Sequence, residues 1–398
     1  MKVSASTPQR WLLCVFACLL FGLFAGPAAA QDITSELRVV VQDQDGNNVE
    51  GVRVRVTHVP TQRSRVMSSS AGGIATARGL QVGGPYSVQP ADPGSFASDG
   101  VQDIYLVLGE TEVVNLGIAA ISAGMMEEVV VSTQQTQQEL RYGVGSDFQE
   151  GFIESIPSIS RDFTSTLATD PKILVDTSVA RGPAVSIAGG NYRFNNVTID
   201  GVAQNDNFGL SKNASATQRS PISIDAIEAL NVNVAPYDVT YGNFVGGNIN
   251  VVTKSGTNEF HGSVYAYQTD DGWAGNKSKG VPLGIQAFSE DVYGGTFGGP
   301  LIKDKLFFFA AYEKFETDRP SNTQIIDNIN GVNQADVDMA RSIIQSEYGF
   351  DPGPFSATDT DEDEKIMLKV DWYINDDHRA VFSYQSADGD VLFDDFPE

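Results

Sequence analysis

The chain is 398 residues long, and 51 acidic residues against 26 basic residues give it a formal net charge of −25. A field of this sign repels a phosphate backbone, so the charge argues against nucleic acid as a partner. Charged residues make up only 19% of the sequence while glycine and aromatic residues are plentiful, which favours β structure over disorder.

The first 30 residues have the pattern of a secretory signal peptide. Lys2 and Arg10 supply positive charge, residues 11–24 form an apolar core, and small residues complete the segment. The apolar run is shorter than the ~20 residues that a membrane-spanning helix needs. Both cysteines, Cys14 and Cys18, lie inside this peptide, so we expect the exported chain to be held together without disulfides.

Residues 31–121 contain short β-rich runs that glycine, proline and aspartate turns separate. The runs are 37–41, 52–58, 73–77, 86–89, 104–108 and 111–116. Strands at this spacing predict a small β-sandwich.

Residues 122–139 form a linker rich in Gln, Ser and Thr, and a valine run lies within it. The run and its flanking residues are Glu127, Glu128, Val129, Val130, Val131 and Ser132. Consecutive valines favour an extended backbone, which can add as a strand to the edge of a partner's sheet. The alternative interpretation is that these residues form the last strand of the sandwich.

Residues 140–257 mix short helices with short strands, which predicts an α/β domain. A helix is expected near Phe163, with Asp162 or Ser160 as its N-cap, and one helical turn is expected after Ser223. Strands are expected at 185–188, 195–199, 229–234 and 248–253.

From residue 258 onward, apolar and polar residues alternate as they do in long β-strands. The expected strands are 260–268, 291–301, 306–315, 365–374 and 378–386. Their connections alternate between tight turns and long loops, which is typical of outer-membrane barrels with short periplasmic turns. An amphipathic helix is expected over 334–348, within the second long loop.

Residues 227–267 join the α/β pattern to the alternating pattern. This region contains the motifs Ala235-Pro236-Tyr237-Asp238, Tyr241-Gly242, Gly246-Gly247 and 253–262, with 191–195 and Asp200-Gly201 upstream. It resembles the plug-to-barrel junction of TonB-dependent outer-membrane transporters, and more narrowly of their Oar-like group. The order of strands and turns in 31–121 is likewise similar to the carboxypeptidase regulatory-like domain, a transthyretin-like and carbohydrate-binding-like fold.

The resemblance implies a multidomain chain. Its parts would be a signal peptide (1–30), a β-sandwich (31–121), a linker (122–139), an α/β plug (140–257) and the first strands of an antiparallel transmembrane β-barrel (258–398). Members of the family have barrels of 22 strands after the plug. We therefore expect this chain to be the N-terminal part of a longer protein, with its strands in an open sheet beside the plug.

The function that this resemblance implies is energy-coupled uptake of a siderophore, oligosaccharide or peptide across the outer membrane of a Gram-negative bacterium. Residues 127–132 would pair with the periplasmic energiser TonB, lipid would surround the barrel, and an unknown extracellular ligand would bind above the plug. Gly190, Asn191, Arg193 and Asn195 are candidates for a ligand-facing plug apex, with a turn-and-packing role as their alternative. The alternative function is a non-transporting surface adhesin or carbohydrate-binding protein.

Residue patterns typical of enzymes and metal sites are not found in the sequence. His58, His261 and His378 are far apart, and none begins a zinc-peptidase motif. The aspartate-rich segments 43–47 and 359–363 lack the glycine and the final glutamate of a calcium loop. We therefore expect no catalysis, no bound metal and no cofactor.

Overall fold

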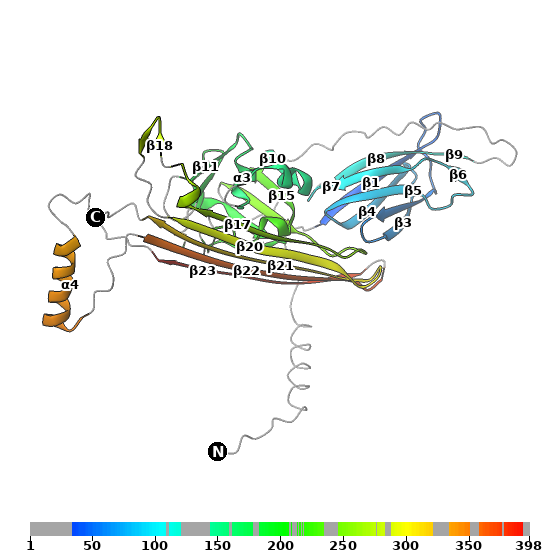
Figure 1. Cartoon of the computed structure of the whole chain (residues 1–398). Helices are drawn as coiled ribbons and strands as arrows, with labels where there is room; N and C mark the ends of the chain where they lie inside the picture. Colours follow the sequence, from blue (N-terminus) through cyan, green and yellow to red (C-terminus); the bar gives the residue numbers. More distant parts are fainter. Residues whose placement is uncertain are drawn as a thin grey trace, which may run out of the picture.

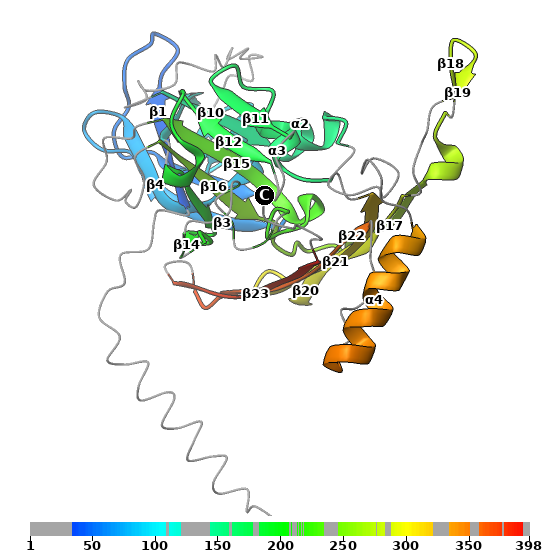
Figure 2. The same cartoon turned by 90° about the vertical axis from the view of Figure 1, so that its left-hand side faces the viewer.

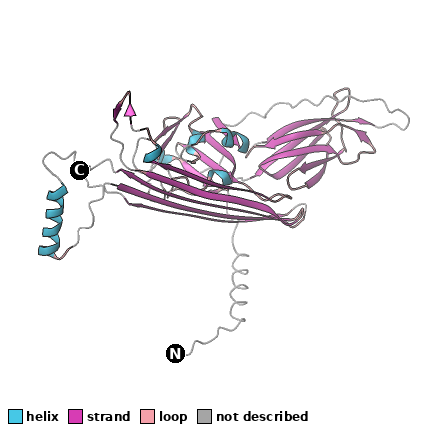
Figure 3. Cartoon of the chain, viewed as in Figure 1, coloured by secondary structure: helices cyan, strands magenta, loops and turns pink. Residues whose placement is uncertain are grey.

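The computed structural model describes most of the chain. The described residues are 34–108, 111–120, 144–158, 161–177, 183–206, 208, 213, 215, 217, 219–234, 246–275, 277–282, 288–320, 334–350, 358–375 and 378–392. The expected signal peptide and the linker with residues 127–132 lie outside them. Strands dominate the described part, as Figure 3 shows.

The N-terminal body, residues 34–120, consists of two sheets around one hydrophobic core. The sheets have the strand orders β4-β1-β8 and β3-β2-β5-β7. Their strands are β1 (Thr34–Gln42), β2 (Arg53–His58), β3 (Arg63–Ser68), β4 (Ile74–Gln81), β5 (Gly83–Pro90), β7 (Val101–Leu106) and β8 (Thr111–Gly117), and a short pair β6 (Phe96–Ala97) and β9 (Ala119–Ala120) lies beside them. Alternate residues of β1 point inward, so Leu37, Val39 and Val41 are fully buried.

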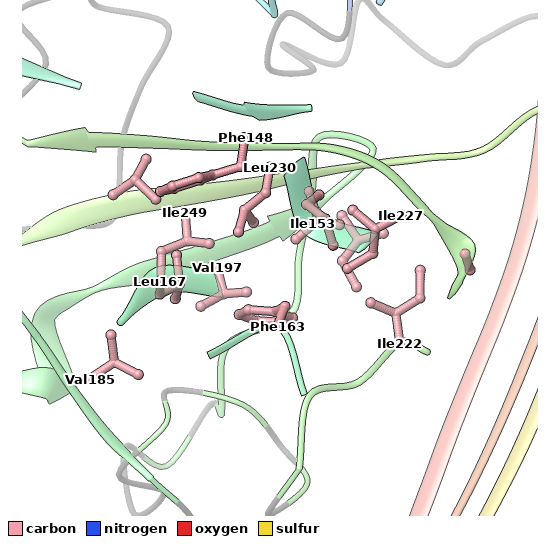
Figure 4. Close-up of a cluster of buried hydrophobic side chains, with 14 of the residues drawn as sticks. Phe148, Ile153, Phe163, Leu167, Val185, Val197, Ile222, Ile227, Leu230 and Ile249 are labelled. Carbon is pink, nitrogen blue, oxygen red and sulfur yellow. The ribbon is translucent and has the colours of Figure 1, made fainter. Parts of the chain in front are cut away.

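The central body, residues 144–253, is built on a sheet of strand order β10-β15-β16-β13-β14. Its elements are β10 (Val144–Gln149), α2 (Glu150–Ser155), α3 (Thr164–Leu167), β11 (Ile173–Asp176), β12 (Ala184–Ile187), η1 (Tyr192–Phe194), β13 (Asn196–Ile199), β14 (Val202–Ala203), η2 (Ile224–Ala226), β15 (Ile227–Val234) and β16 (Gly247–Thr253). One face of the sheet packs on the helices: Val197, Leu230 and Ile249 gather with Ile153 and Leu167 in one cluster (Figure 4).

The strand wall is a five-stranded antiparallel sheet in which consecutive strands are neighbours. Its strands are β17 (His261–Asp270), β20 (Ser289–Ile302), β21 (Leu306–Pro320), β22 (Thr358–Tyr373) and β23 (Arg379–Leu392). Within the described residues this sheet is open, and it curves along one side of the central body (Figures 1 and 2). The open sheet beside the expected plug was predicted from the sequence.

The two faces of β22 differ in the way that its sequence predicts. Met367 and Lys369 point toward the central body and are buried, whereas Leu368 and Trp372 on the opposite face are about half exposed, at 47% and 50%. The outward face is therefore apolar, and the inward face carries charged side chains. This is the distribution of a barrel strand with lipid on one side and polar contents on the other.

The two ends of the strand wall carry different connections. One end carries the long loops, with η3 (Asp271–Trp273), β18 (Lys277–Ser278), β19 (Val281–Pro282) and the expected helix α4 (Gln334–Tyr348). The other end carries the short turns 303–305 and 374–378, and the N-terminal body lies beside it (Figure 1). No helix within the described ranges is long and apolar enough to cross a membrane.

Several elements were missed by the sequence analysis. Strands β3, β10 and β11 and helix α2 were not expected, because each is short and lacks a periodic apolar face. Strand β10, for example, contains Gly145, Ser146 and Asp147, which are poor strand formers, and its pairing with β15 holds it in place. Strand β22 begins at Thr358 and not at residue 365, because the mostly acidic segment 359–364 pairs with β21.

Of the two expected helix caps, Asp162 lies one residue before Phe163, which is the N-cap of α3, and Ser223 is the N-cap of η2. The carboxylate of Asp162 accepts the backbone N–H of Thr164 at 2.8 Å, at the start of α3. Ser160 lies outside the described residues. Ser223 precedes η2 but makes no capping bond, because its hydroxyl is bonded to side chains of the strand wall.

Candidate functional site

A buried carboxylate connects the strand wall to the central body. Glu313, on the inward face of β21, is 0% exposed. Its carboxylate accepts hydrogen bonds from Lys365 Nζ of β22 at 3.0 Å, from Tyr265 Oη of β17 at 2.8 Å and from Ser223 Oγ of the central body at 3.0 Å. One side chain thereby links three barrel strands to the body that lies against them.

Two arginines of the central body surround the same carboxylate. Arg219 Nη1 lies 3.6 Å from one oxygen of Glu313, and Arg161 Nε lies 3.9 Å from the other. Arg161 also pairs with Asp225 and stacks on the Tyr265 ring, with its guanidinium carbon 3.9 Å from the ring centroid. Burial alone would lower the pKa of Arg161, but Asp225, Tyr265 and Glu313 together raise it above its ordinary value.

A second polar contact lies closer to the short turns. Lys369 Nζ, on the inward face of β22, donates to the carbonyl and the hydroxyl of Thr253 at 3.0 and 2.9 Å and lies 3.3 Å from Asp200. Asp200 in turn accepts the backbone N–H of Thr253 at 3.0 Å. The wall therefore contacts the end of β16, just before the chain crosses into the wall at residues 254–258.

The residues expected at the plug apex lie at the opposite end of the central body. Strands β13 and β16 are parallel, and β16 ends next to the short turns. The segment before β13, which contains Gly190, Asn191, Arg193 and Asn195, therefore lies at the end distant from those turns.

The four expected apex residues differ in what they do. Asn195 is buried, and its amide donates to the Val185 carbonyl at 2.7 Å and accepts from the Gly247 N–H at 3.3 Å. The Asn191 side chain accepts the N–H of Arg193 at 3.0 Å and so caps η1. The N–H of Gly190 donates to the Ile187 carbonyl. These bonds fit the turn-and-packing alternative for Gly190, Asn191 and Asn195. The side chains of Asn191 and Arg193 are nevertheless exposed.

One exposed residue of this segment was missed by the sequence analysis. Phe194 is 53% exposed, between the exposed Arg193 and the buried Asn195. A large aromatic residue inside a run of polar residues was the signal that could have identified it. Together, Asn191, Arg193 and Phe194 offer an amide, a cation and an aromatic ring on one surface.

A partly buried acid, Glu228, lies where the central body meets the N-terminal body. Burial raises the pKa of Glu228 on β15 to about 7, and the Glu150 carboxylate adds to this shift, whereas Lys254 and Lys369 oppose it. Lys254 Nζ lies 2.6 Å from Glu150. Glu228 is therefore the group of this interface that titrates near neutral pH.

No group of three or more His, Cys, Asp or Glu side chains within the described ranges is arranged to hold a metal ion. His58 is buried in the N-terminal body, where burial lowers its pKa to about 4. Buried polar contacts thus join the central body to the strand wall, and exposed polar and aromatic side chains lie at one end of the central body.

Two families match consecutive parts of the chain. Residues 153–248 match the TonB-dependent Receptor Plug Domain, and residues 252–330 match an Outer membrane beta barrel domain. The first match covers most of the central body, and the second begins at the end of β16 and covers the first three strands of the wall.

Two curated proteins are similar to the chain. The TonB-dependent transporter Oar of Myxococcus xanthus is 28% identical over 383 residues, which are 91% of this chain and 34% of that protein. The probable TonB-dependent siderophore receptor PirA of Acinetobacter baumannii is 34% identical over 102 residues, which are 24% of this chain and 12% of that protein. The chain thus spans about a third of the first relative and a smaller part of the second.

Among solved structures, the outer membrane transporter YddB from Escherichia coli is similar to 62% of this chain and 33% of its own, at 17% identity and a TM-score of 0.42.

Proposed function

We propose that this chain, which carries a TonB-dependent receptor plug domain followed by part of an outer membrane β-barrel domain, acts in a receptor for energy-coupled uptake. Its location is the outer membrane of a Gram-negative bacterium. Receptors of this class work with a TonB energiser and bind extracellular ligands. The matched domains are those of transporters and receptors, so we propose binding and transport without catalysis.

The observation that carries this proposal is the buried network around Glu313. It joins the central body to the inward face of three strands, so the body occupies the side where a barrel would have its lumen. A plug must be held firmly and yet be released, and polar contacts suit both needs. Water can replace each hydrogen bond when the surfaces separate, so the net cost of breaking one is only about 1 kcal/mol.

We also propose which domain each part of the structure corresponds to. The N-terminal body corresponds to the carboxypeptidase regulatory-like β-sandwich (31–121), the central body to the plug (140–257), and the wall to the first barrel strands (258–398). Two sheets that share the core of Leu37, Val88 and Ile104 support the first assignment. The short turns beside the N-terminal body would face the periplasm, and the loops with α4 would face outward.

Ligand binding is proposed at the plug apex and the loops above it. Asn191, Arg193 and Phe194 are exposed there, and Gly190 and Asn195 shape the turn that presents them. The printed name of one relative describes a siderophore receptor and that of the other a transporter. A siderophore, an oligosaccharide and a peptide all remain candidate ligands. A non-transporting adhesin is not favoured, because a plug seated against a barrel wall has no role in adhesion.

The partner proposed for residues 127–132 is the periplasmic domain of TonB, by addition of an extended strand. Proline removes one ladder N–H and fixes φ, so Val130→Pro in the full-length protein should weaken binding to the purified TonB domain at least tenfold. Gln138→Pro, in the same linker but outside the valine run, is the matched control and should bind normally. Binding is measured by calorimetry with the receptor in detergent. If Val130→Pro bound as tightly as the control, the pairing role would be wrong.

A further inference from the structure

The N-terminal body contacts three other parts of the molecule at once: the residues 254–258, the short turns of the wall, and the central body. Residues 254–258, which we call the hinge, carry the chain from the central body into the wall. The N-terminal body lies against the end of the wall where these parts meet (Figure 1).

Asn258 is the meeting point of the hinge, the N-terminal body and the wall. Its backbone N–H donates to the Pro60 carbonyl at 2.9 Å, and its side-chain amide donates to the Thr61 carbonyl at 2.6 Å. The same side chain exchanges two bonds with Asp304 of the first short turn, at 2.8 and 2.9 Å. The last residue of the hinge is therefore held from both sides.

Arg63 of the N-terminal body connects the two short turns. Its guanidinium donates to the Asp304 carbonyl at 3.2 Å and to the Asn375 carbonyl at 3.4 Å, and it lies 5.1 Å from the centroid of the Tyr373 ring. Tyr373 Oη also donates to the side-chain carbonyl of Gln81 at 3.1 Å. Arg63 thus binds both short turns, and Gln81 binds the end of β22 beside the second turn.

An apolar contact joins the N-terminal body to the central body. Val82 and Leu108 form one buried cluster with Ala229 and Val252, and all four are less than 9% exposed. Beside them, Glu228 lies so close to Gly83 that a Cβ at this glycine would collide with its carboxylate, and Gly83 has a φ of +90°. The surfaces are therefore closely fitted to each other.

The loop that binds the hinge is itself held in shape. The Nδ1 atom of His58 lies 2.8 Å from Thr61 Oγ1, and both residues are buried. Gln62 donates to the Val59 carbonyl at 2.7 Å through its side chain. A rigid loop loses little conformational freedom when it binds, which favours docking.

We propose that the N-terminal body is a latch, which docks on the periplasmic mouth and holds the central body in its seated position. This inference rests on the proposed function, since it assumes a plug that moves. The linker 122–139 lies in the part of the sequence between β9 and β10. Strand β10 lies at the edge of the central sheet beside β15. A pulling force on residues 127–132 would act on both the N-terminal body and β10. It would release the latch from the hinge as well as draw β10 away from its neighbour.

The latch is tested with the full-length protein in planar lipid bilayers, where ion conductance reports an open lumen as urea is added. The variant Arg63→Ala/Gln81→Ala removes contacts from the N-terminal body alone and leaves the barrel residues intact. We expect the urea concentration that opens the channel to fall by about 1 M, because the variant loses two hydrogen-bonding side chains. The matched control is Arg53→Ala, which breaks an exposed 3.1 Å ion pair with Asp92 on the same body and should leave the concentration unchanged.

A second variant works in the opposite direction. Arg63→Cys/Asn375→Cys, bridged by a bismaleimide in a protein free of other cysteines, ties the body to the turn and should raise the opening concentration. Arg53→Cys/Ser68→Cys, which bridges partner residues of β2 and β3 within the body, is its control. If the wild type opens with urea but neither variant differs from its control, the latch proposal is wrong. The proposed seated plug is not contradicted by that result. A wild type that conducts without urea would contradict the seated plug, and the latch with it.

Discussion

At the scale of single residues, the contact between plug and wall depends on Glu313 more than on any other side chain of the network. It is enclosed, and its charge is balanced by Lys365, Arg161 and Arg219. Buried ion pairs of this kind contribute modestly as a whole, because each charge loses its water. Removal of one member is costly, because it leaves the others buried and uncompensated.

Glu313→Gln should therefore lower the free energy of unfolding by about 3–5 kcal/mol, the range for loss of one member of a buried pair. Urea titration of the full-length protein, followed by protease resistance of the plug, measures this loss. Glu316→Gln is the control on the same strand, since the Glu316 side chain is 41% exposed beside Lys314 and should cost less than about 1 kcal/mol. Equal costs for the two variants would show that the network does not hold the plug.

The sequence alone did not identify this residue. Glu313 shares a strand face with Phe307, Phe309 and Ala311, and an acid on an otherwise apolar face is a signal of a buried partner. Its partners come from four other segments, and no sequence spacing relates them. The role of Asn195 was open for the same reason: both interpretations fit the pattern, and only the positions of Val185 and Gly247 separate them.

At the scale of elements, the contact of β5 with β15 depends on the protonation of Glu228. Its pKa rises from 4.5 to about 7 on burial, so its neutral form is stable inside. The stability it contributes is fully present below about pH 4.5 and is lost as the pH rises through about 7. His58 acts in the opposite sense, because its pKa is lowered to about 4 and its contribution is lost as the pH falls.

Glu228→Gln isolates the first effect, because it leaves His58 in place. The variant should match the wild type at about pH 4.5 and be the more stable protein at about pH 8, with the difference growing between these values. The urea midpoint at each pH is the measurement. A constant difference across this range would mean that Glu228 does not titrate at the interface.

Elements with a clear apolar pattern were predicted well, and elements without one were missed. The alternation in 366–374 located β22 and both of its faces, because a strand between lipid and lumen must repeat every two residues. Strand β10 contains Gly145, Ser146 and Asp147 in succession and so shows no apolar alternation, and helix α2 buries only Ile153. The sequence analysis assigned the mostly acidic start of β22 to a loop. In the structure, pairing with β21 makes it part of the strand.

At the scale of the whole molecule, the chain runs from the central body through the hinge into the strand wall. The hinge passes from the central body to the wall beside the short turns, where the N-terminal body also docks. Strand β17 then runs away from that end toward the long loops (Figure 1). The sequence predicted this direction from loop lengths, whereas the docking of the N-terminal body depends on contacts that no local pattern contains.

The most direct test of the account is which end of the strand wall faces the cell exterior. Lys277→Cys lies in the first long loop and Lys303→Cys in the first short turn, and both lysines are exposed. A membrane-impermeant maleimide is applied to intact cells that carry the full-length protein, and again after the outer membrane is permeabilised. We predict that Lys277→Cys is labelled in intact cells and Lys303→Cys only after permeabilisation. Labelling of Lys303→Cys in intact cells would contradict a receptor with its plug and N-terminal body on the periplasmic side.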